Sequence, residues 1–131
     1  MAASCSAVPP LERLRLIQQL KSEGFLAGVN AIPVLPFISD TIEQLEKIVA
    51  AAKAHNADYV LTGGLTLFGD DKASSKTSFY KFLQRHDASL ISAYDKLYAG
   101  NFYPPFQYQN ELRERALLLC KKYNIRNSIL A

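Results

Sequence analysis

The sequence predicts an α/β fold made of two strand-to-helix units followed by a helical C-terminal part. An almost unbroken apolar run at Phe25–Ile32 is typical of a parallel strand that is covered on both faces. A second strand is expected at about Asp58–Thr62, and stretches with apolar residues every three or four positions flank both strands. A right-handed crossover between the two strands makes them parallel and neighbouring.

The first helix is expected at about Pro10–Glu23, where leucine and isoleucine occupy one face and charged side chains the other. Proline is tolerated in the first turn of a helix, and Gly24 suits a left-handed C-terminal cap. The strand that follows should end by Ile32 or Val34, because the two prolines around that point cannot donate to a central ladder.

Two polar residues around this strand each allow two interpretations. Asn30, near the carboxyl end of an otherwise apolar strand, either bonds neighbouring backbone, which we favour, or points into a ligand site. Asp40, with Glu43 three residues later, matches a capping box at the start of a helix that extends to about Ala54. For Asp40 we favour a purely capping role over a functional one.

The second strand is followed directly by Gly63 and Gly64. Paired glycines allow backbone conformations that are closed to other residues and let a ligand approach the chain closely. They equally suit a loop without a ligand, so both interpretations stay open. The polar loop that comes next carries an acidic pair and does not resemble a phosphate-binding loop.

Helical patterns dominate the rest of the chain. Three helices are expected at about Ser75–Arg85, Leu90–Tyr98 and Asn110–Tyr123, and a third strand could form only at Ile125–Leu130. Asp87 is a suitable N-cap for the middle helix. The aromatic loop before the last helix could stack bases, but we expect Phe102, Tyr103 and Phe106 to pack onto the core.

Composition indicates one ordinary domain. The chain has 131 residues, of which 49% are apolar; residues 9–131 form the expected domain, and residues 1–8, which lack periodicity, form an expected disordered segment. The net charge of +3 is scattered along the chain, which is not the pattern of a nucleic-acid surface. No apolar run reaches the roughly 18–20 residues of a membrane span, so we expect no membrane contact and a cytosolic location.

The cysteines do not form a metal-binding pattern. Cys5 and Cys120 lie at opposite ends of the chain, and neither has a second cysteine or histidine at metal-ligand spacing. His55 and His86 are isolated as well. We therefore expect no metal site and no catalytic residue in this chain alone. The helical spacing around Cys120 predicts a small buried apolar side chain there.

Three segments carry a resemblance to a known family. They read P-P-L-E-R-L-R-L-I-Q-Q-L at residues 9–20, G-V-N-A-I-P-V-L-P-F-I-S-D at residues 28–40, and L-T-L-F-G-D followed by K-T-S-F-Y-K-F-L between residues 65 and 83. In this order they resemble the C-terminal half of radical SAM proteins of the spore-photoproduct-lyase-like branch, also described as DNA repair photolyase-like. The likeness extends from about Pro9 to Ile125.

The resemblance implies the C-terminal portion of a partial TIM-type (β/α) barrel with two or three parallel strands. This agrees with the strand count, because two parallel strands alone leave edges of unpaired amides and carbonyls. Members of the family bind a [4Fe-4S] cluster through a C-x-x-x-C-x-x-C loop and cleave S-adenosylmethionine, which makes them lyase-like enzymes. That loop belongs to the half that this sequence does not resemble, and neither cysteine here matches it, so neither cofactor is expected to bind this chain alone.

What the resemblance does carry over is the strand-end wall of the cofactor pocket, without any acid–base role. By position, that wall consists of Asn30, Ile32, Pro33, Val34, Pro36, Thr62 and Gly63.

Three hypotheses about the function follow. The chain is the C-terminal part of a radical SAM enzyme, present here as a fragment; or it is the second chain of a split enzyme, whose partner supplies the missing N-terminal cluster-binding half. The alternative is a non-enzymatic α/β module that binds a protein or small molecule through Gly28–Asp40. A role with nucleic acid is implied only by the resemblance.

Overall fold

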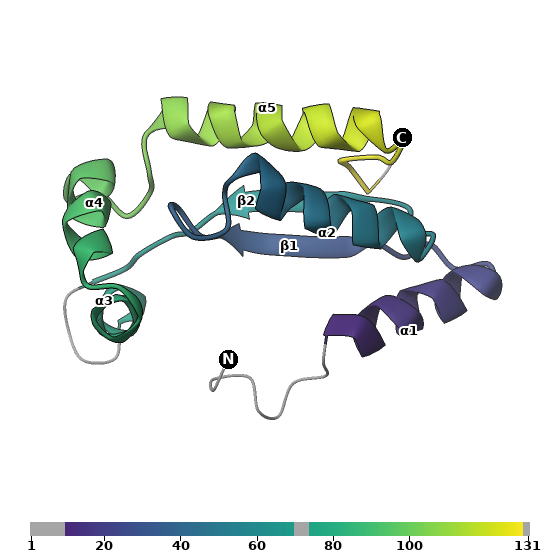
Figure 1. The fold of residues 1–131 in the computed structure, drawn as a ribbon, viewed down its shortest axis with the longest axis horizontal. Coiled ribbons are helices and arrows are strands. Elements are labelled where there is room, and N and C mark those ends of the chain that lie inside the picture. Colours follow the sequence, from purple (N-terminus) through teal and green to yellow (C-terminus); the bar gives the residue numbers. More distant parts are fainter. Residues whose placement is uncertain (1–9, 70–73, 130–131) are drawn as a thin grey trace.

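The computed structural model describes residues 10–69 and 74–129, and in these ranges it contains five helices and one two-stranded parallel sheet (Figure 1). In chain order the elements are α1 Pro10–Ser22, β1 Val29–Val34, α2 Ile42–Ala54, β2 Val60–Gly64, α3 Ser75–His86, α4 Ser89–Tyr98 and α5 Phe106–Lys122. This order confirms the predicted α/β fold with a helical C-terminal part. The disordered segment expected at residues 1–8 lies outside the described residues.

The two strands are adjacent and parallel, as predicted. Val29 lies opposite Val60, and Ala31 lies opposite Thr62. Pairing is irregular between Ala31 and Val34, a stretch that contains the cis peptide bond before Pro33. β1 ends at Val34, in agreement with the limit that the prolines impose.

Both strands begin later than predicted. The segment expected to start β1, at Phe25, is instead irregular, and Phe25 and Leu26 are 58% and 53% exposed. An apolar run forms a buried strand only where a second layer covers it, and none covers this segment. β2 runs over Val60–Gly64 rather than Asp58–Thr62, so the paired glycines lie inside the strand and not after it.

One face of the sheet packs against α2 and α5 (Figure 1). The buried cluster between them consists of Val34, Leu45, Val49, Ala52, Ala57, Val60, Leu112, Leu119 and Cys120. Burying an aliphatic side chain of this size stabilises the fold by about 1.5–3 kcal/mol. Cys120 is 3% exposed, which confirms its predicted role as a small core side chain.

α1 contributes little to this core. None of its residues is buried, and Leu11 and Leu16 are 50% and 55% exposed. Only Ile17 packs against the cluster, and Lys21 bonds the Asp58 carboxylate at 2.7 Å. The helix lies beyond the edge of β1 that faces away from β2 (Figure 1). Its apolar residues therefore have an incomplete set of partners.

A second buried cluster joins α3 and α4 to the loops at the carboxyl ends of the strands. Its buried members are Leu67, Leu83, Tyr94 and Tyr98. The arrowhead of β1 points toward these two helices in Figure 1. The N-cap position of α4 is Ala88, one residue after the predicted Asp87, although the Asp87 carboxylate accepts the backbone N–H of Ser89 at 3.1 Å. The α3–α4 pair thus closes the end of the sheet where a ligand site was expected.

The last helix starts four residues before the predicted Asn110. Pro105 occupies the N-cap position, and its carbonyl accepts the Gln109 N–H at 3.1 Å. Beyond α5, the expected third strand is a single parallel bridge between Tyr59 and Arg126, with the Val60 N–H donating to the Arg126 carbonyl at 2.9 Å.

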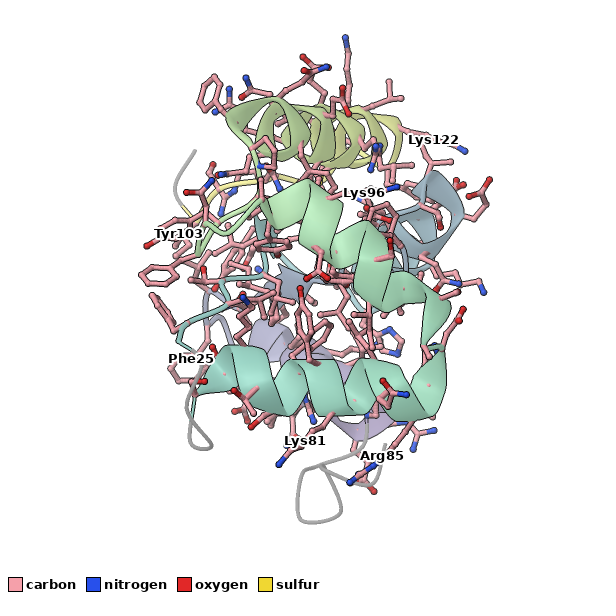
Figure 2. All side chains as sticks on the ribbon, turned by 90° about the vertical axis from the view of Figure 1, so that its left-hand side faces the viewer. Phe25, Lys81, Arg85, Lys96, Tyr103 and Lys122 are labelled. Atoms are coloured by element: carbon pink, nitrogen blue, oxygen red, sulfur yellow. The ribbon has the colours of Figure 1, made fainter. Side chains whose placement is uncertain are left out.

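The prediction that the aromatic loop packs onto the core is wrong. Phe102, Tyr103 and Phe106 are 49%, 56% and 77% exposed. The Phe102 ring pairs with another exposed ring, that of Phe68, with centroids 5.2 Å apart. Tyr103 and Phe25 extend from the same side of the molecule in Figure 2. These rings are therefore largely exposed to solvent and do not join either buried cluster.

Among residues 10–69 and 74–129, none of the helices has both the length and the apolar character that crossing a membrane requires.

Candidate functional site

The loop between β1 and α2 is held in one conformation by its own side chains. The Ser39 hydroxyl accepts the Leu35 N–H at 2.8 Å, and the Asp40 carboxylate accepts the Phe37 N–H at 3.1 Å. Phe37 has a φ of 63°, a left-handed conformation that is uncommon outside glycine and here is supported by the bond to Asp40. The cap of α2 is Thr41, whose hydroxyl accepts the Gln44 N–H, so the predicted capping role of Asp40 is displaced by one residue.

Asp40 instead joins this loop to α5. Its second carboxylate oxygen accepts the Tyr108 hydroxyl at 2.8 Å, and Arg115 donates to its backbone carbonyl at 2.8 Å. Asp40 is 8% exposed, so both of its carboxylate oxygens are paired in a largely dry setting. Burial, and then the bond to Asp40, raise the pKa of Tyr108. Tyr108 therefore stays a hydrogen-bond donor across the physiological pH range.

Two tyrosines of α4 hold both strand-to-helix loops in the same way. The Tyr94 hydroxyl donates to the Pro36 carbonyl at 2.6 Å, and the Tyr98 hydroxyl donates to the Leu65 carbonyl at 2.5 Å. Burial raises the pKa of Tyr98 to about 12 and raises that of Tyr94 as well. These bonds position the carboxyl ends of β1 and β2 against one rigid helix.

Three of the predicted wall residues share the uncovered face of the sheet. Val29, Ala31 and Val60 pack toward the helices, so the strand alternation places Asn30, Ile32 and Gly63 on the other face. Asn30 is exposed, and its side-chain amide makes no hydrogen bond to the described residues. The favoured interpretation of Asn30, a bond to neighbouring backbone, is therefore wrong.

Gly63 has a steric role on this face. A Cβ at Gly63 would lie 3.2 Å from Cγ1 of Ile32, so the absence of a side chain lets Ile32 lie flat across β2. Ile32 is nevertheless 50% exposed. The two residues form a small apolar shelf that is open to solvent.

The other predicted wall residues lie elsewhere. Val34 is in the core and Pro36 is buried beneath Tyr94, while Pro33 is exposed. Thr62 faces α5, where it lines a hollow of about 260 Å³ together with Asn110 and Arg113. The seven predicted residues thus do not form one continuous wall within the described part of the chain.

Sequence reasoning missed Asn110 and Arg113 at this hollow, and the three tyrosines that hold the loops. The spacing of four between Tyr94 and Tyr98 matches one helix face, so the sequence pattern alone presents both as part of an apolar stripe. A tyrosine in such a stripe brings a hydroxyl into the core, and that hydroxyl requires a partner. That requirement was the signal available in the sequence.

A larger apolar groove, of about 560 Å³, runs along the free edge of β1 between α1 and α2. Leu14 and Ile17 line it from α1, and Ile48 and Ala51 line it from α2. The strand segment Gly28–Ala31 lies along its floor. We refer to it as the edge groove.

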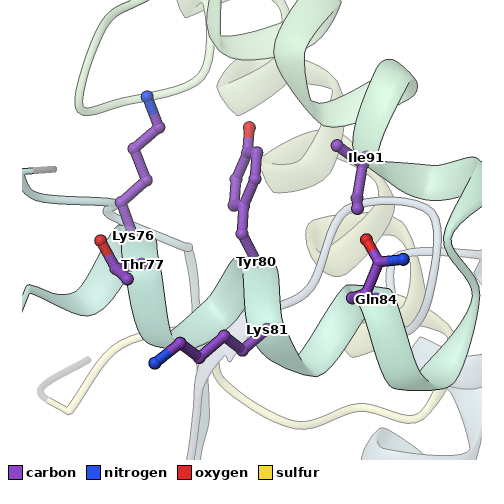
Figure 3. A pocket seen from close by; sticks show the side chains of 6 residues that line it. All are labelled: Lys76, Thr77, Tyr80, Lys81, Gln84 and Ile91. Atoms are coloured by element: carbon purple, nitrogen blue, oxygen red, sulfur yellow. The ribbon is translucent and has the colours of Figure 1, made fainter. Parts of the chain in front are cut away.

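A third hollow, of about 430 Å³, lies on the surface of α3 and α4 (Figure 3). The Tyr80 hydroxyl donates to Asp95 at 2.7 Å, and the ammonium of Lys76 lies 5.7 Å from the Tyr80 ring centroid. The Tyr80 side chain of this hollow thus already has partners on the same two helices.

The residues do not fit an iron–sulfur cluster. The described ranges contain no group of three or more histidine, cysteine or acidic side chains that could hold a metal ion. Cys120 lies in the core, where burial raises the pKa of its thiol, whereas a cluster needs accessible thiolates. Cys5 lies outside the described residues. A cluster would therefore depend on ligands other than the described residues of this chain.

Comparison with known proteins finds longer relatives. Uncharacterized protein Rv2578c of Mycobacterium tuberculosis and uncharacterized protein Mb2609c of Mycobacterium bovis are each 34% identical to this chain over 116 residues. The match covers 88% of this chain and 33% of each relative, so the chain spans about a third of their length. The chain matches no protein-family model and no solved structure.

Proposed function

We propose that this chain forms the C-terminal part of a radical SAM enzyme, a partial (β/α) barrel whose cluster-binding residues belong to the remainder of the complete protein. The observation that carries the proposal is the one-sided sheet. α2 and α5 cover one face of two parallel strands, and the other face presents Asn30 and Ile32 to solvent. In a barrel of parallel strands the helices lie outside and the uncovered face lines the interior.

The length of the relatives supports the same proposal. The chain corresponds to about a third of Rv2578c, so two thirds of that protein remain available for other strands and for cluster ligands. The resemblance over residues 9–20, 28–40 and 65–83 is the support for this family, and the cluster of such a protein would supply reductive cleavage of S-adenosylmethionine. The proposed location is the reducing cytosol.

The residues of this chain would bind and orient the cofactor rather than react with it. Asn30 offers a free side-chain amide, and the shelf of Ile32 over Gly63 offers an apolar surface of the kind that an adenine or ribose contacts. The Asp40–Tyr108 bond and the Tyr94–Pro36 bond keep the adjoining loop rigid. A rigid wall lowers the entropy lost when a ligand is bound.

A chimera tests the proposal. The M. tuberculosis relative, with this chain in place of its matched 116-residue segment, is purified without oxygen and supplied with iron and sulfide. Its iron content and its formation of 5′-deoxyadenosine from S-adenosylmethionine and dithionite are measured, beside those of the unaltered relative. We expect both proteins to hold a cluster and to form 5′-deoxyadenosine.

Two variants of the chimera locate the contact. Ile32→Arg places a charge on the proposed wall and should lower 5′-deoxyadenosine formation at least tenfold without loss of iron. Leu118→Arg is the matched control, because Leu118 is 60% exposed on α5 and should change neither quantity. An unaltered relative that holds no iron–sulfur cluster and forms no 5′-deoxyadenosine would refute the proposal. The non-enzymatic binding module would then be the hypothesis that remains.

A further inference from the structure

The hollow between β2 and α5 lies on the helix side of the sheet, on the opposite face from Asn30 and Ile32. Thr62 lines it from β2, and Asn110 and Arg113 line it from α5, at a volume of about 260 Å³. α5 runs back along β2 (Figure 1), so the first turns of this helix lie beside the carboxyl end of the strand. Whatever fills this hollow is therefore held by side chains that the proposed function does not use.

Three polar side chains of the hollow have no partner among the described residues. They are the Thr62 hydroxyl, the Asn110 amide and the Arg113 guanidinium. Thr62 and Asn110 are half-buried, whereas Arg113 is exposed. Asn110 and Arg113 are three residues apart on α5, so both side chains project from one face of the helix. The hollow thus offers a hydroxyl, an amide and a guanidinium to a ligand.

Two other amides fix the rim of the hollow. The Gln109 side chain donates to the Pro104 carbonyl at 2.8 Å, which holds the loop that enters α5. The Asn127 side chain donates to the Val60 carbonyl at 2.6 Å, which holds the segment after α5 against β2. Both amides line the hollow. Because these walls are already held in place, a ligand loses less entropy in ordering them.

The edge of β2 adds a backbone donor. The Val60 N–H donates to the Arg126 carbonyl at 2.9 Å, so the main-chain groups of Val60 point away from β1. Alternate residues of a parallel strand direct their main-chain groups to the same side. The N–H of Thr62 therefore points to the edge at which Asn127 and the hollow lie.

Charge selects an anionic ligand. Arg113 is the one charged side chain among the described residues that line the hollow. The positions three and four residues away from it on α5 carry neutral side chains: Gln109, Asn110, Ala116 and Leu117. No helix neighbour at this spacing therefore forms an ion pair with it. A guanidinium fits a carboxylate through two parallel N–H···O bonds, and the amide beside it supplies a further donor.

The apolar part of the lining selects a ligand with an aromatic body. Phe106 lines the hollow at the start of α5 and is 77% exposed, and Leu112 lines it from the core side. An inorganic ion would leave the Phe106 ring in water, whereas an aromatic ring would pack against it. The volume lies below the roughly 300–1,000 Å³ of sites for drug-sized ligands, so the ligand is small.

We propose that the hollow between β2 and α5 binds a small carboxylic acid with an aromatic body. The carboxylate accepts from Arg113 and Asn110, and the body packs against Phe106. The proposal requires neither S-adenosylmethionine nor an iron–sulfur cluster, so it and the proposed function can fail separately.

Phenylacetate is the probe. It is titrated into the full chain labelled with ¹⁵N, beside phenylacetamide, acetate and inorganic phosphate at constant pH and ionic strength. We expect phenylacetate to shift the amide signals of Thr62, Gly64 and Asn110 with a dissociation constant on the order of 1 mM. Phenylacetamide has the same shape without the charge and should bind at least tenfold more weakly. Acetate lacks the ring and should bind at least threefold more weakly.

Two variants separate the parts of the site. Arg113→Gln should weaken phenylacetate at least tenfold. Phe106→Ala should weaken phenylacetate at least threefold but leave acetate within twofold, because it removes only the ring contact. Lys121→Gln is the matched control, since Lys121 is an exposed cation of the same helix that does not line the hollow. It should leave every affinity within twofold.

Circular dichroism checks that each variant is folded. Arg113 and Phe106 are both exposed, and each variant tests the proposal by itself. The proposal is overturned if phenylacetate shifts no amide of β2 or α5, or if phenylacetamide binds as tightly as phenylacetate. Phosphate or acetate that binds as tightly as phenylacetate would indicate a general anion site and would overturn it as well. So would a folded Arg113→Gln variant with unchanged affinity.

Discussion

The bond between Tyr108 and Asp40 offers a direct measure of what holds the β1–α2 loop. Replacing Tyr108 by phenylalanine removes one hydroxyl and leaves the largely buried Asp40 carboxylate with the Phe37 N–H as its remaining described partner. A hydrogen bond to a charged group contributes about 1.5–3 kcal/mol, so we expect the free energy of unfolding to fall by about 2 kcal/mol. For a chain of this length, that corresponds to a melting temperature lower by about 7 °C.

The assay is urea and thermal unfolding followed by circular dichroism. Tyr103→Phe is the control, because Tyr103 is 56% exposed in the aromatic loop and should change the melting temperature by less than 1 °C. A double variant, Tyr108→Phe with Asp40→Asn, should lose less than the sum of the two single losses, since both remove the same bond. Additive losses, or a Tyr108→Phe variant as stable as the parent, would show that the bond does not hold the loop in solution.

Three further outcomes are expected. The bond from Lys21 lowers the pKa of Asp58, so the ionised carboxylate stabilises the fold at pH values above 3.8, the ordinary pKa of this group. This contribution is lost as the pH falls below 3.8 and passes through the pKa of the folded state. Asp58→Asn should therefore make the urea unfolding midpoint change less between about pH 5 and about pH 2.5. Gly28→Ala should lower the free energy of unfolding by about 1–3 kcal/mol, because the new Cβ would lie 2.6 Å from the Tyr59 ring. Adding Tyr59→Leu to the same chain should restore part of this loss. An unchanged urea unfolding midpoint for Gly28→Ala alone would contradict this packing. The purified chain should self-associate through the uncovered face of the sheet, which size-exclusion chromatography measures. Ile32→Asn should shift its elution volume toward that of a monomer. A chain that stays monomeric at all concentrations and unfolds cooperatively would favour the self-sufficient binding module.

Local patterns were sufficient for the helices. The period of leucine and isoleucine placed α1 within one residue of its observed end, and Asp87 was predicted one residue before the N-cap of α4, Ala88. These predictions succeed because a helix closes its hydrogen bonds between residues three or four apart, so the deciding contacts are near in sequence. The strand limit at Val34 succeeded for the same kind of reason, the missing N–H of proline.

Errors arose where burial depends on a distant element. Phe25 is as apolar as the strand residues after it, and Phe106 is as aromatic as a core side chain, yet both remain exposed. The hydrophobicity of a side chain predicts that its burial lowers the free energy of the fold. It does not predict whether the fold provides a surface for that side chain to pack against. Phe25 lies in the irregular segment before β1 and Phe106 lies at the first position of α5, and neither is covered by another described element.

The sequence by itself determined the α/β class, the order of the elements and the parallel pairing, because periodicity, capping and crossover handedness are properties of neighbouring residues. Only the tertiary structure decided that Tyr108 meets Asp40 and that Tyr94 meets Pro36, pairs separated by 68 and 58 positions. It alone placed Thr62 and Ile32 on opposite faces and opened a groove along β1. Such contacts depend on how complete layers pack, and no short stretch of sequence contains that information.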